Sequence, residues 1–298
     1  MRPPVVATAG SADPRSPLVV LLHGRGSHER EILTLAGHLP ATFGYASVRA
    51  PIAEGGGYAW FANRGIGRPL PDSLRTGLDW FRAWLDSYAA GRPVFLAGFS
   101  GGAAFAGGLL LDDPGRWAGA AILYGTLPFD AGLPTTPGHL AGVPVFVAQG
   151  DHDRVIPREL LNRTWEYATG ESGATATARR DPVGHEIAPD VLTALSGWLT
   201  ATAASLPAAP VGGLFVASVD ASSIGSLPAP SDGSPAASLG GPLIASSDGS
   251  LASLRASSGG SSDSARGWTA TSSGGSPAAP SGPLVAPSGD RRNERTTP

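Results

Sequence analysis

Three short stretches of the sequence carry residue types that can together transfer an acyl group. The first is GFSGG at residues 98–102, a G-x-S-x-G pattern between an apolar run and an Ala/Gly/Leu segment. In that setting the serine lies on a sharp strand-to-helix turn, and the glycines avoid collisions with neighbouring backbone. The N–H of Gly101 at the helix start can donate to an oxyanion. We predict that Ser100 is a nucleophile; an incidental serine in a glycine-rich turn is the alternative.

The second and third stretches supply a carboxylate and an imidazole. GDHDRVIP at 150–157 contains Asp151 and Asp153, and DPVGHEIAPD places His185 on a loop before a predicted final helix. A histidine that takes the serine proton needs a fixed carboxylate behind it. Asp153 is favoured because it matches the G-x-x-D spacing usual at such a strand end, which leaves Asp151 as a turn former. An Asp-rich turn before a helix and a solvated loop histidine are the alternatives.

A fourth stretch, LLHGRGSHE at 21–29, suggests a loop that brings its backbone close to a reacting atom. The apolar run stops at His23, and two glycines flank Arg25, which favours exposed N–H groups. A dinucleotide site is the weaker reading, because Glu29 stands where the third glycine of G-x-G-x-x-G would fall. His23 is expected to order the loop.

The elements that must position these residues are strands that alternate with helices. The apolar runs are continuous rather than alternating, as expected for strands buried on both faces. This order predicts an α/β fold with a mostly parallel central sheet, helices on both faces and polar clusters at the carboxyl ends of the strands. Predicted strands cover 17–24, 93–100, 118–125 and 143–150, and predicted helices cover 29–39, 72–89, 103–111, 157–168 and 189–199.

Composition divides the chain in two. Residues 1–204 have the mixture of a globular catalytic domain, whereas 205–298 are rich in Ser, Gly, Pro and Ala and contain near-repeats such as SLPAPSDGSPAASL. The second part lacks the apolar periodicity that could offset the entropy of ordering. We therefore predict a disordered C-terminal tail after a single domain.

Charge and composition exclude several classes of function. A net charge of -3 gives no electrostatic footprint for nucleic acid, and zero cysteines exclude a thiolate nucleophile and Cys-ligated zinc. No HExxH or comparable spacing exists, so we expect no metal and no cofactor. The sequence has no signal-peptide h-region and no apolar stretch long enough to span a membrane. Cytoplasmic localisation without stable membrane insertion is the expectation.

Taken together, these motifs resemble those of the phospholipase/carboxylesterase group of α/β-hydrolases, which includes acyl-protein thioesterases and small bacterial esterases. The chain order Ser100, Asp153, His185 is that of α/β-hydrolases and differs from the chymotrypsin and subtilisin orders. The resemblance spans roughly 17–199 and is carried by LLHGRGS, YAWF, GFSGG, GDHDRVIP and GHEI.

The resemblance implies a role for each matching residue. Ser100 would be the nucleophile, with Asp153 and His185 as its partners, and the N–H groups of Arg25 and Gly101 would form the oxyanion hole. Acyl-protein thioesterases commonly have glutamine directly after the serine, whereas this sequence has Gly101 there.

Sequence also suggests the class of substrate. Trp60 and Phe61 of YAWF could line an acyl pocket or belong to the core, and Leu127 and Phe129 lie on a Pro/Gly-rich loop too short for a lipase lid. We expect small-molecule esters of short to medium acyl chains. Acyl thioesterase, lysophospholipase or peptidase activity is the alternative on the same fold, and a non-catalytic binding module is a further one. A homodimer is compatible with the sequence.

Overall fold

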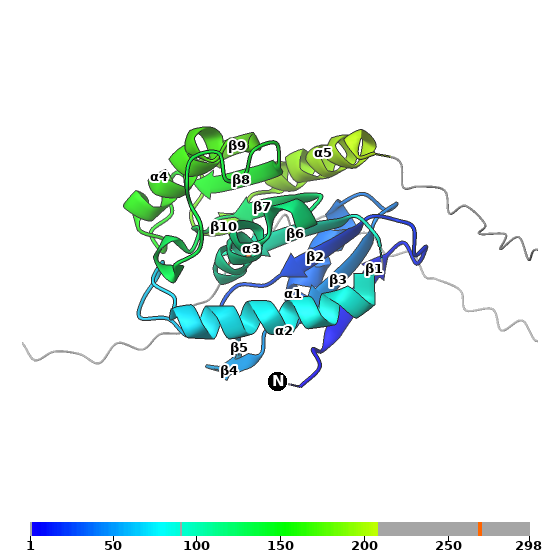
Figure 1. The fold of residues 1–298 in the computed structure, drawn as a ribbon, viewed down its shortest axis with the longest axis horizontal. Helices are drawn as coiled ribbons and strands as arrows, with labels where there is room; N and C mark the ends of the chain where they lie inside the picture. Colours follow the sequence, from blue (N-terminus) through cyan, green and yellow to red (C-terminus); the bar gives the residue numbers. More distant parts are fainter. Residues whose placement is uncertain (1, 90, 208–267, 270–298) are drawn as a thin grey trace, which may run out of the picture. The chain divides into compact units, whose positions relative to one another are not determined.

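A seven-stranded sheet forms the centre of the computed structural model, which describes residues 2–89, 91–207 and 268–269. The strand order is β1-β3-β2-β6-β7-β8-β9, and only the β1–β3 pair is antiparallel. The mostly parallel sheet predicted from the sequence is therefore confirmed (Figure 1). The strands are β1 (Val6–Gly10), β2 (Leu18–Leu22), β3 (Gly44–Val48), β6 (Val94–Phe99), β7 (Gly119–Leu123), β8 (Pro144–Gly150) and β9 (Thr175–Asp181).

Helices cover both faces of this sheet. Buried side chains of α2 and α3 share one core cluster with the sheet, whereas α5 packs on the other face. The helix α1 contacts β1, β2 and β3, and the 3-10 turn η1 that follows it contacts α5. The helices are α1 (Glu29–Leu33), α2 (Pro71–Ala89), α3 (Gly101–Asp112), α4 (Arg158–Glu166) and α5 (Pro189–Ser205), with η1 at Thr34–His38 and a π-helical turn η4 at Tyr167–Glu171.

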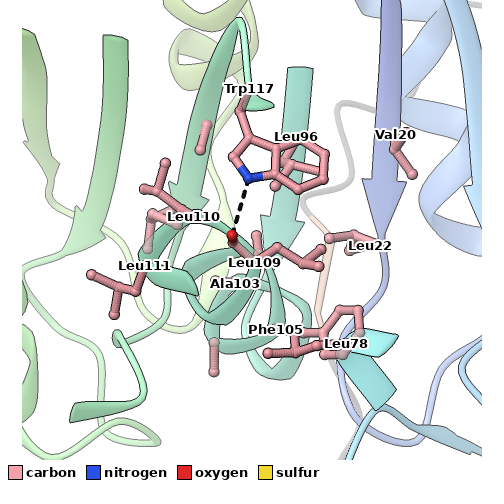
Figure 2. Close-up of a cluster of buried hydrophobic side chains, with 14 of the residues drawn as sticks. Val20, Leu22, Leu78, Leu96, Ala103, Phe105, Leu109, Leu110, Leu111 and Trp117 are labelled. Carbon is pink, nitrogen blue, oxygen red and sulfur yellow. Dashed lines mark hydrogen bonds between the residues drawn. The ribbon is translucent and has the colours of Figure 1, made fainter. Parts of the chain in front are cut away.

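The continuous apolar runs arise because the central strands have two buried faces. Successive side chains of a strand point to opposite sides of the sheet. Figure 2 shows Val20 and Leu22 of β2 in the cluster that also holds Phe105 of α3. On the opposite face, Phe95 of β6 packs against Trp198 of α5, with ring centroids 6.0 Å apart. A strand between two helical layers therefore favours apolar residues at successive positions rather than at alternate ones.

A small hairpin and one short strand pair lie outside the main sheet. The hairpin joins β4 (Ile52–Glu54) to β5 (Gly57–Ala59), and β10 (Glu186–Ile187) pairs antiparallel with β11 (Trp268–Thr269). The predicted catalytic domain, 1–204, ends one residue before α5 does. The predicted tail, 205–298, lies outside the described residues except for 205–207 and 268–269. Among the helices of the described part, none is both long and apolar enough to cross a membrane.

Candidate active site

Ser100 lies on a strained turn between β6 and α3. Its backbone has φ 55° and ψ -115°, a region that non-glycine residues rarely adopt and that costs about 1–3 kcal/mol. A Cβ atom at Gly98 would lie 2.2 Å from the carbonyl oxygen of Gly102, and one at Gly102 would lie 2.1 Å from that of Leu22. Both glycines are therefore required by close approach of the backbone, which is the physical reason for the G-x-S-x-G pattern.

Ser100, His185 and Asp153 form a continuous chain of hydrogen bonds. The His185 Nδ1 atom lies 2.8 Å from Asp153 Oδ2, and His185 Nε2 lies 2.8 Å from Ser100 Oγ. An ionised carboxylate can only accept, so Nδ1 carries the proton of the neutral ring and Nε2 accepts from the serine hydroxyl. This arrangement allows the histidine to take a proton from the serine.

The carboxylate of Asp153 is held by main-chain donors as well as by the histidine. Its Oδ1 atom accepts hydrogen bonds from the N–H groups of Val155 at 2.8 Å and Ile156 at 3.0 Å, and the residue is buried. Burial by itself would raise the pKa of Asp153, but the hydrogen bonds from His185, Ile156 and Val155 outweigh it and lower the pKa. The carboxylate is therefore charged and fixed in orientation.

The structure brings Asp153, rather than Asp151, against His185. Asp151 is exposed, and its backbone N–H donates to the Asp181 carbonyl at 2.8 Å. In the same loop, His152 N–H donates to the Val183 carbonyl at 3.0 Å. These contacts join the loop after β8 to the loop after β9 and so set the distance between Asp153 and His185.

The two residues predicted to supply the oxyanion donors lie close together. A Cβ atom built on Gly101 would be 3.2 Å from the backbone nitrogen of Arg25. Gly101 is the first residue of α3, where N–H groups have no partner within the helix. Within the described part of the chain, neither N–H donates to a main-chain carbonyl. Both remain available to a ligand next to Ser100.

His23 fixes the orientation of the peptide that carries the Arg25 donor. The backbone N–H of Ala50 donates to His23 Nε2 at 3.1 Å, so Nδ1 carries the ring proton and donates to the Gly24 carbonyl at 2.8 Å. In a trans peptide the carbonyl and the following N–H point in opposite directions. The Arg25 N–H is thereby turned away from the His23 ring. Burial lowers the pKa of His23 to about 4, which keeps the ring neutral.

The four residues predicted to bind substrate have different environments. The Trp60 side chain is 1% exposed, stacks on Phe105 with centroids 4.6 Å apart, and donates from Nε1 to the His23 carbonyl. Phe61 and Leu127 are also buried in the core cluster. Phe129 is half-buried and packs edge-on against Tyr167. Trp60 thus supports the loop after β2, and contact of any of the four with an acyl group stays a prediction.

Metal ligands do not gather at this site. The residues that the structure describes contain no group of three or more His, Asp or Glu side chains that could hold a metal ion. The chemistry available here is that of the serine, the imidazole, the carboxylate and the two main-chain donors.

The fold and this site define an α/β-hydrolase, and comparison with known proteins identifies its family. Residues 4–203 match the family model described as Phospholipase/Carboxylesterase, so the chain belongs to that family. The Bacillus subtilis (strain 168) protein MhqD is 26% identical over 176 residues, which cover 57% of this chain and 86% of MhqD.

Solved structures have the same fold. A carboxylesterase from Bacillus cereus has a TM-score of 0.60 at 22% identity, over 67% of this chain and 94% of that one. A carboxylesterase from Mesorhizobium loti has a TM-score of 0.55 at 26% identity, over 62% and 88%. The chain is a hydrolase of the carboxylesterase/phospholipase family.

Stability should depend on pH through His23. In the unfolded chain a histidine takes up a proton near its ordinary pKa of about 6.5, whereas His23 in the folded state does so only at about 4. Between these values the unfolded state binds more protons, so the free energy of unfolding falls as pH falls, by about 3 kcal/mol in total. Urea unfolding of wild type and His23→Asn at pH 7 and pH 4 measures this contribution.

The asparagine variant keeps a donor near the Nδ1 position but cannot titrate. We expect it to be less stable than wild type at pH 7, because the Ala50 N–H loses its acceptor, and to lose less stability on acidification. The carboxylates titrate in both proteins and cancel in the comparison. An equal loss in the two proteins would mean that His23 is not buried in its neutral form.

Proposed function

We propose that the protein is a serine carboxylesterase that cleaves small-molecule esters of short to medium acyl chains through an acyl-enzyme intermediate. The observation that carries the proposal is the hydrogen-bonded chain from Ser100 through His185 to Asp153, beside two N–H groups that have no main-chain acceptor among the described residues. Family membership supports hydrolysis of this general class. The roles of the individual residues and the chain length of the substrate are the proposal.

In the first step, Ser100 Oγ attacks the ester carbonyl carbon while its proton moves to His185 Nε2. The carbonyl oxygen becomes an oxyanion, which the N–H groups of Arg25 and Gly101 stabilise. Asp153 stabilises the imidazolium that forms. The carbon–oxygen bond to the leaving group then breaks, and His185 gives its proton to the departing alcohol.

In the second step, water takes the place of the alcohol. His185 removes a proton from the water as it attacks the acyl-enzyme carbonyl, and a second oxyanion forms in the same hole. The bond from carbon to Ser100 Oγ breaks, and the serine recovers its proton from His185. The products are a carboxylic acid and the free enzyme, so the reaction consumes only ester and water.

The packing of apolar side chains between β7 and β8 supports a preference for short to medium acyl chains. The segment between β7 and β8 has its leucines buried: Leu127, Leu133 and Leu140 are all in the core cluster. In the described residues, the large apolar side chains classed as exposed are Val5, Ile66, Tyr88 and Val155. These four residues are far apart in the sequence, which favours action on soluble esters over adsorption to a lipid aggregate.

Replacing the serine tests the nucleophile. Ser100→Ala should lower kcat by roughly 10⁴- to 10⁶-fold, because the members of a triad act as a unit. A fluorophosphonate probe should label wild type at Ser100 and leave the variant unlabelled, which peptide mass spectrometry can measure. Near-normal ester hydrolysis by the variant would refute the assignment.

The two aspartates can be separated by isosteric replacement. Asp153→Asn should reduce kcat by about 10⁴-fold, because the imidazole loses the carboxylate that fixes its tautomer. Asp151→Asn is the matched control, since that side chain is exposed and the His185 Nδ1 atom pairs with Asp153 instead. Steady-state kinetics on one soluble ester compare them, and a larger loss in Asp151→Asn would transfer the role.

Acyl-chain preference can be measured with p-nitrophenyl esters and matched acyl thioesters. Each methylene added to the acyl chain should raise kcat/KM, because its burial contributes at most about 0.8 kcal/mol of binding free energy. Once the pocket is full, longer chains should be poorer substrates. We expect little or no rise in rate when the substrate passes its solubility limit. A maximum on long-chain emulsions would contradict the esterase proposal, and a preference for thioesters would favour an acyl thioesterase.

A further inference from the structure

We propose that Glu54 is a positioning residue for the oxyanion hole, acting through the side chain of Arg25. This inference rests on the proposed function, because it concerns the donor that would stabilise the oxyanion. Arg25 would have two separate roles: its backbone N–H faces the reacting carbonyl, and its guanidinium anchors the loop that carries this N–H.

The guanidinium of Arg25 is held at three of its donors. Nε donates to Glu54 Oε1 at 2.5 Å, and one terminal nitrogen donates to Glu54 Oε2 at 2.5 Å. The other terminal nitrogen donates to the Phe61 carbonyl at 3.0 Å. A bidentate pair of this kind fixes the plane of the guanidinium as well as its distance from the carboxylate.

The hairpin that carries Glu54 packs against the loop that carries Arg25. Glu54 ends β4 and stands opposite Gly57 in the β4–β5 hairpin. That hairpin is joined to the loop after β2 by hydrogen bonds from Gly26 N–H to the Tyr58 carbonyl at 2.9 Å and from Tyr58 N–H to the Ser27 carbonyl at 3.0 Å. A Cβ atom at Gly57 would lie 1.9 Å from the Gly26 carbonyl oxygen, so the two backbones are in direct contact. The hairpin that carries Glu54 is therefore held against the loop that carries Arg25.

The pair with Glu54 matters because the other contacts of this loop fix the plane of the Gly24–Arg25 peptide but not the position of the Arg25 N–H. His23 fixes the plane of the Gly24–Arg25 peptide from one end. The Arg25 N–H has no main-chain acceptor within the described residues, so no hydrogen bond of its own holds it. The side chain shares its Cα with that peptide, so the pair with Glu54 limits displacement of the donor. A small displacement of a donor weakens its hydrogen bond steeply, and it lowers the rate of a reaction that depends on precise orientation.

Because this pair is partly exposed, its effect on catalysis can be distinguished from its effect on folding stability. The side chains of Arg25 and Glu54 are 32% and 43% exposed, and pairs this exposed contribute little to the stability of a fold. Removing the carboxylate should therefore affect turnover more than the melting temperature. A purely structural ion pair would show the opposite pattern.

The experiment compares Glu54→Gln with wild type and with Asp86→Asn. The control breaks another partly exposed carboxylate–arginine pair, Asp86–Arg116, between α2 and the turn η2 (Pro114–Arg116), outside the site. For Glu54→Gln we expect kcat to fall about tenfold, less than the loss of a whole oxyanion donor, with KM within about twofold of wild type. The rate of fluorophosphonate labelling of Ser100 should fall by the same factor as kcat. The melting temperature should stay within about 2 °C of wild type.

A double-mutant cycle of Glu54→Gln and Arg25→Ala measures whether the two side chains act together, so the test does not depend on either variant alone. Arg25→Ala keeps the backbone donor and removes the guanidinium, so it should resemble Glu54→Gln, and the double variant should be no worse than Arg25→Ala alone. The pH dependence of kcat should be the same in all four proteins, because the triad is intact in each. Asp86→Asn should match wild type in every measurement.

Separate outcomes refute the two proposals. If wild type neither hydrolyses esters nor reacts at Ser100, the proposed function fails. If wild type is active and Glu54→Gln equals it in kcat and labelling rate, or if the two substitutions are additive, only the positioning role fails. A loss of melting temperature in Glu54→Gln with unchanged kcat would make the pair structural.

Discussion

The close contact of main chain around Ser100 is the constraint on which the rest of the site depends. The first turn of α3 presses against the end of β2, so that Gly102 has no room for a side chain beside the carbonyl of Leu22. The same contact places the start of α3 against the loop that leaves β2, which brings Gly101 close to the backbone nitrogen of Arg25. The positive φ of Ser100 is what allows the chain to turn from β6 into α3 this tightly. The strained backbone at Ser100 and the closeness of Gly101 to Arg25 therefore have one cause. The packed helical layers on both faces of the sheet offset the free energy that this strain costs.

The remaining residues are placed by loops that follow neighbouring parallel strands. The loops after β2, β6, β8 and β9 leave the same edge of the sheet, because those strands run parallel. β2 pairs with β6, β8 pairs with β9, and β7 lies between the two pairs. Main-chain hydrogen bonds then join the loops: the N–H groups of Asp151 and His152 bind the segment that leads to His185. Tyr124, at the end of β7, adds a phenol that donates to Asp181 and accepts from the N–H of Ala188. Carboxylate and imidazole thus keep their separation without relying on flexible side chains.

Sequence could predict those parts of the fold whose physical demands leave a pattern in residue type. Strands β2, β6, β7 and β8 are buried on both faces and appear as apolar runs, and the turn at Ser100 leaves paired glycines. The edge strands β1 and β9 leave no such run and are missed, since each contains exposed polar positions. The predicted helix at 29–39 is an α-helix only over its first half, then a 3-10 turn. Trp60 could not be assigned because core and acyl pocket are both apolar, and Glu54 has no local pattern, since its partner Arg25 is distant in sequence.

The peptide between Gly24 and Arg25 is held from two ends by interactions of opposite character. His23 is buried and neutral, so it can orient the carbonyl without placing a charge in the core, at the cost of a histidine that resists protonation. Arg25 and Glu54 are charged and partly exposed, so water screens their attraction and they add little to folding, yet their bidentate geometry still restricts position. The orientation of the Gly24–Arg25 peptide therefore depends on a buried residue of the core, whereas its position depends on a hairpin at the surface. Substitutions in the β4–β5 hairpin can therefore alter the donor geometry while the core and the triad stay unchanged.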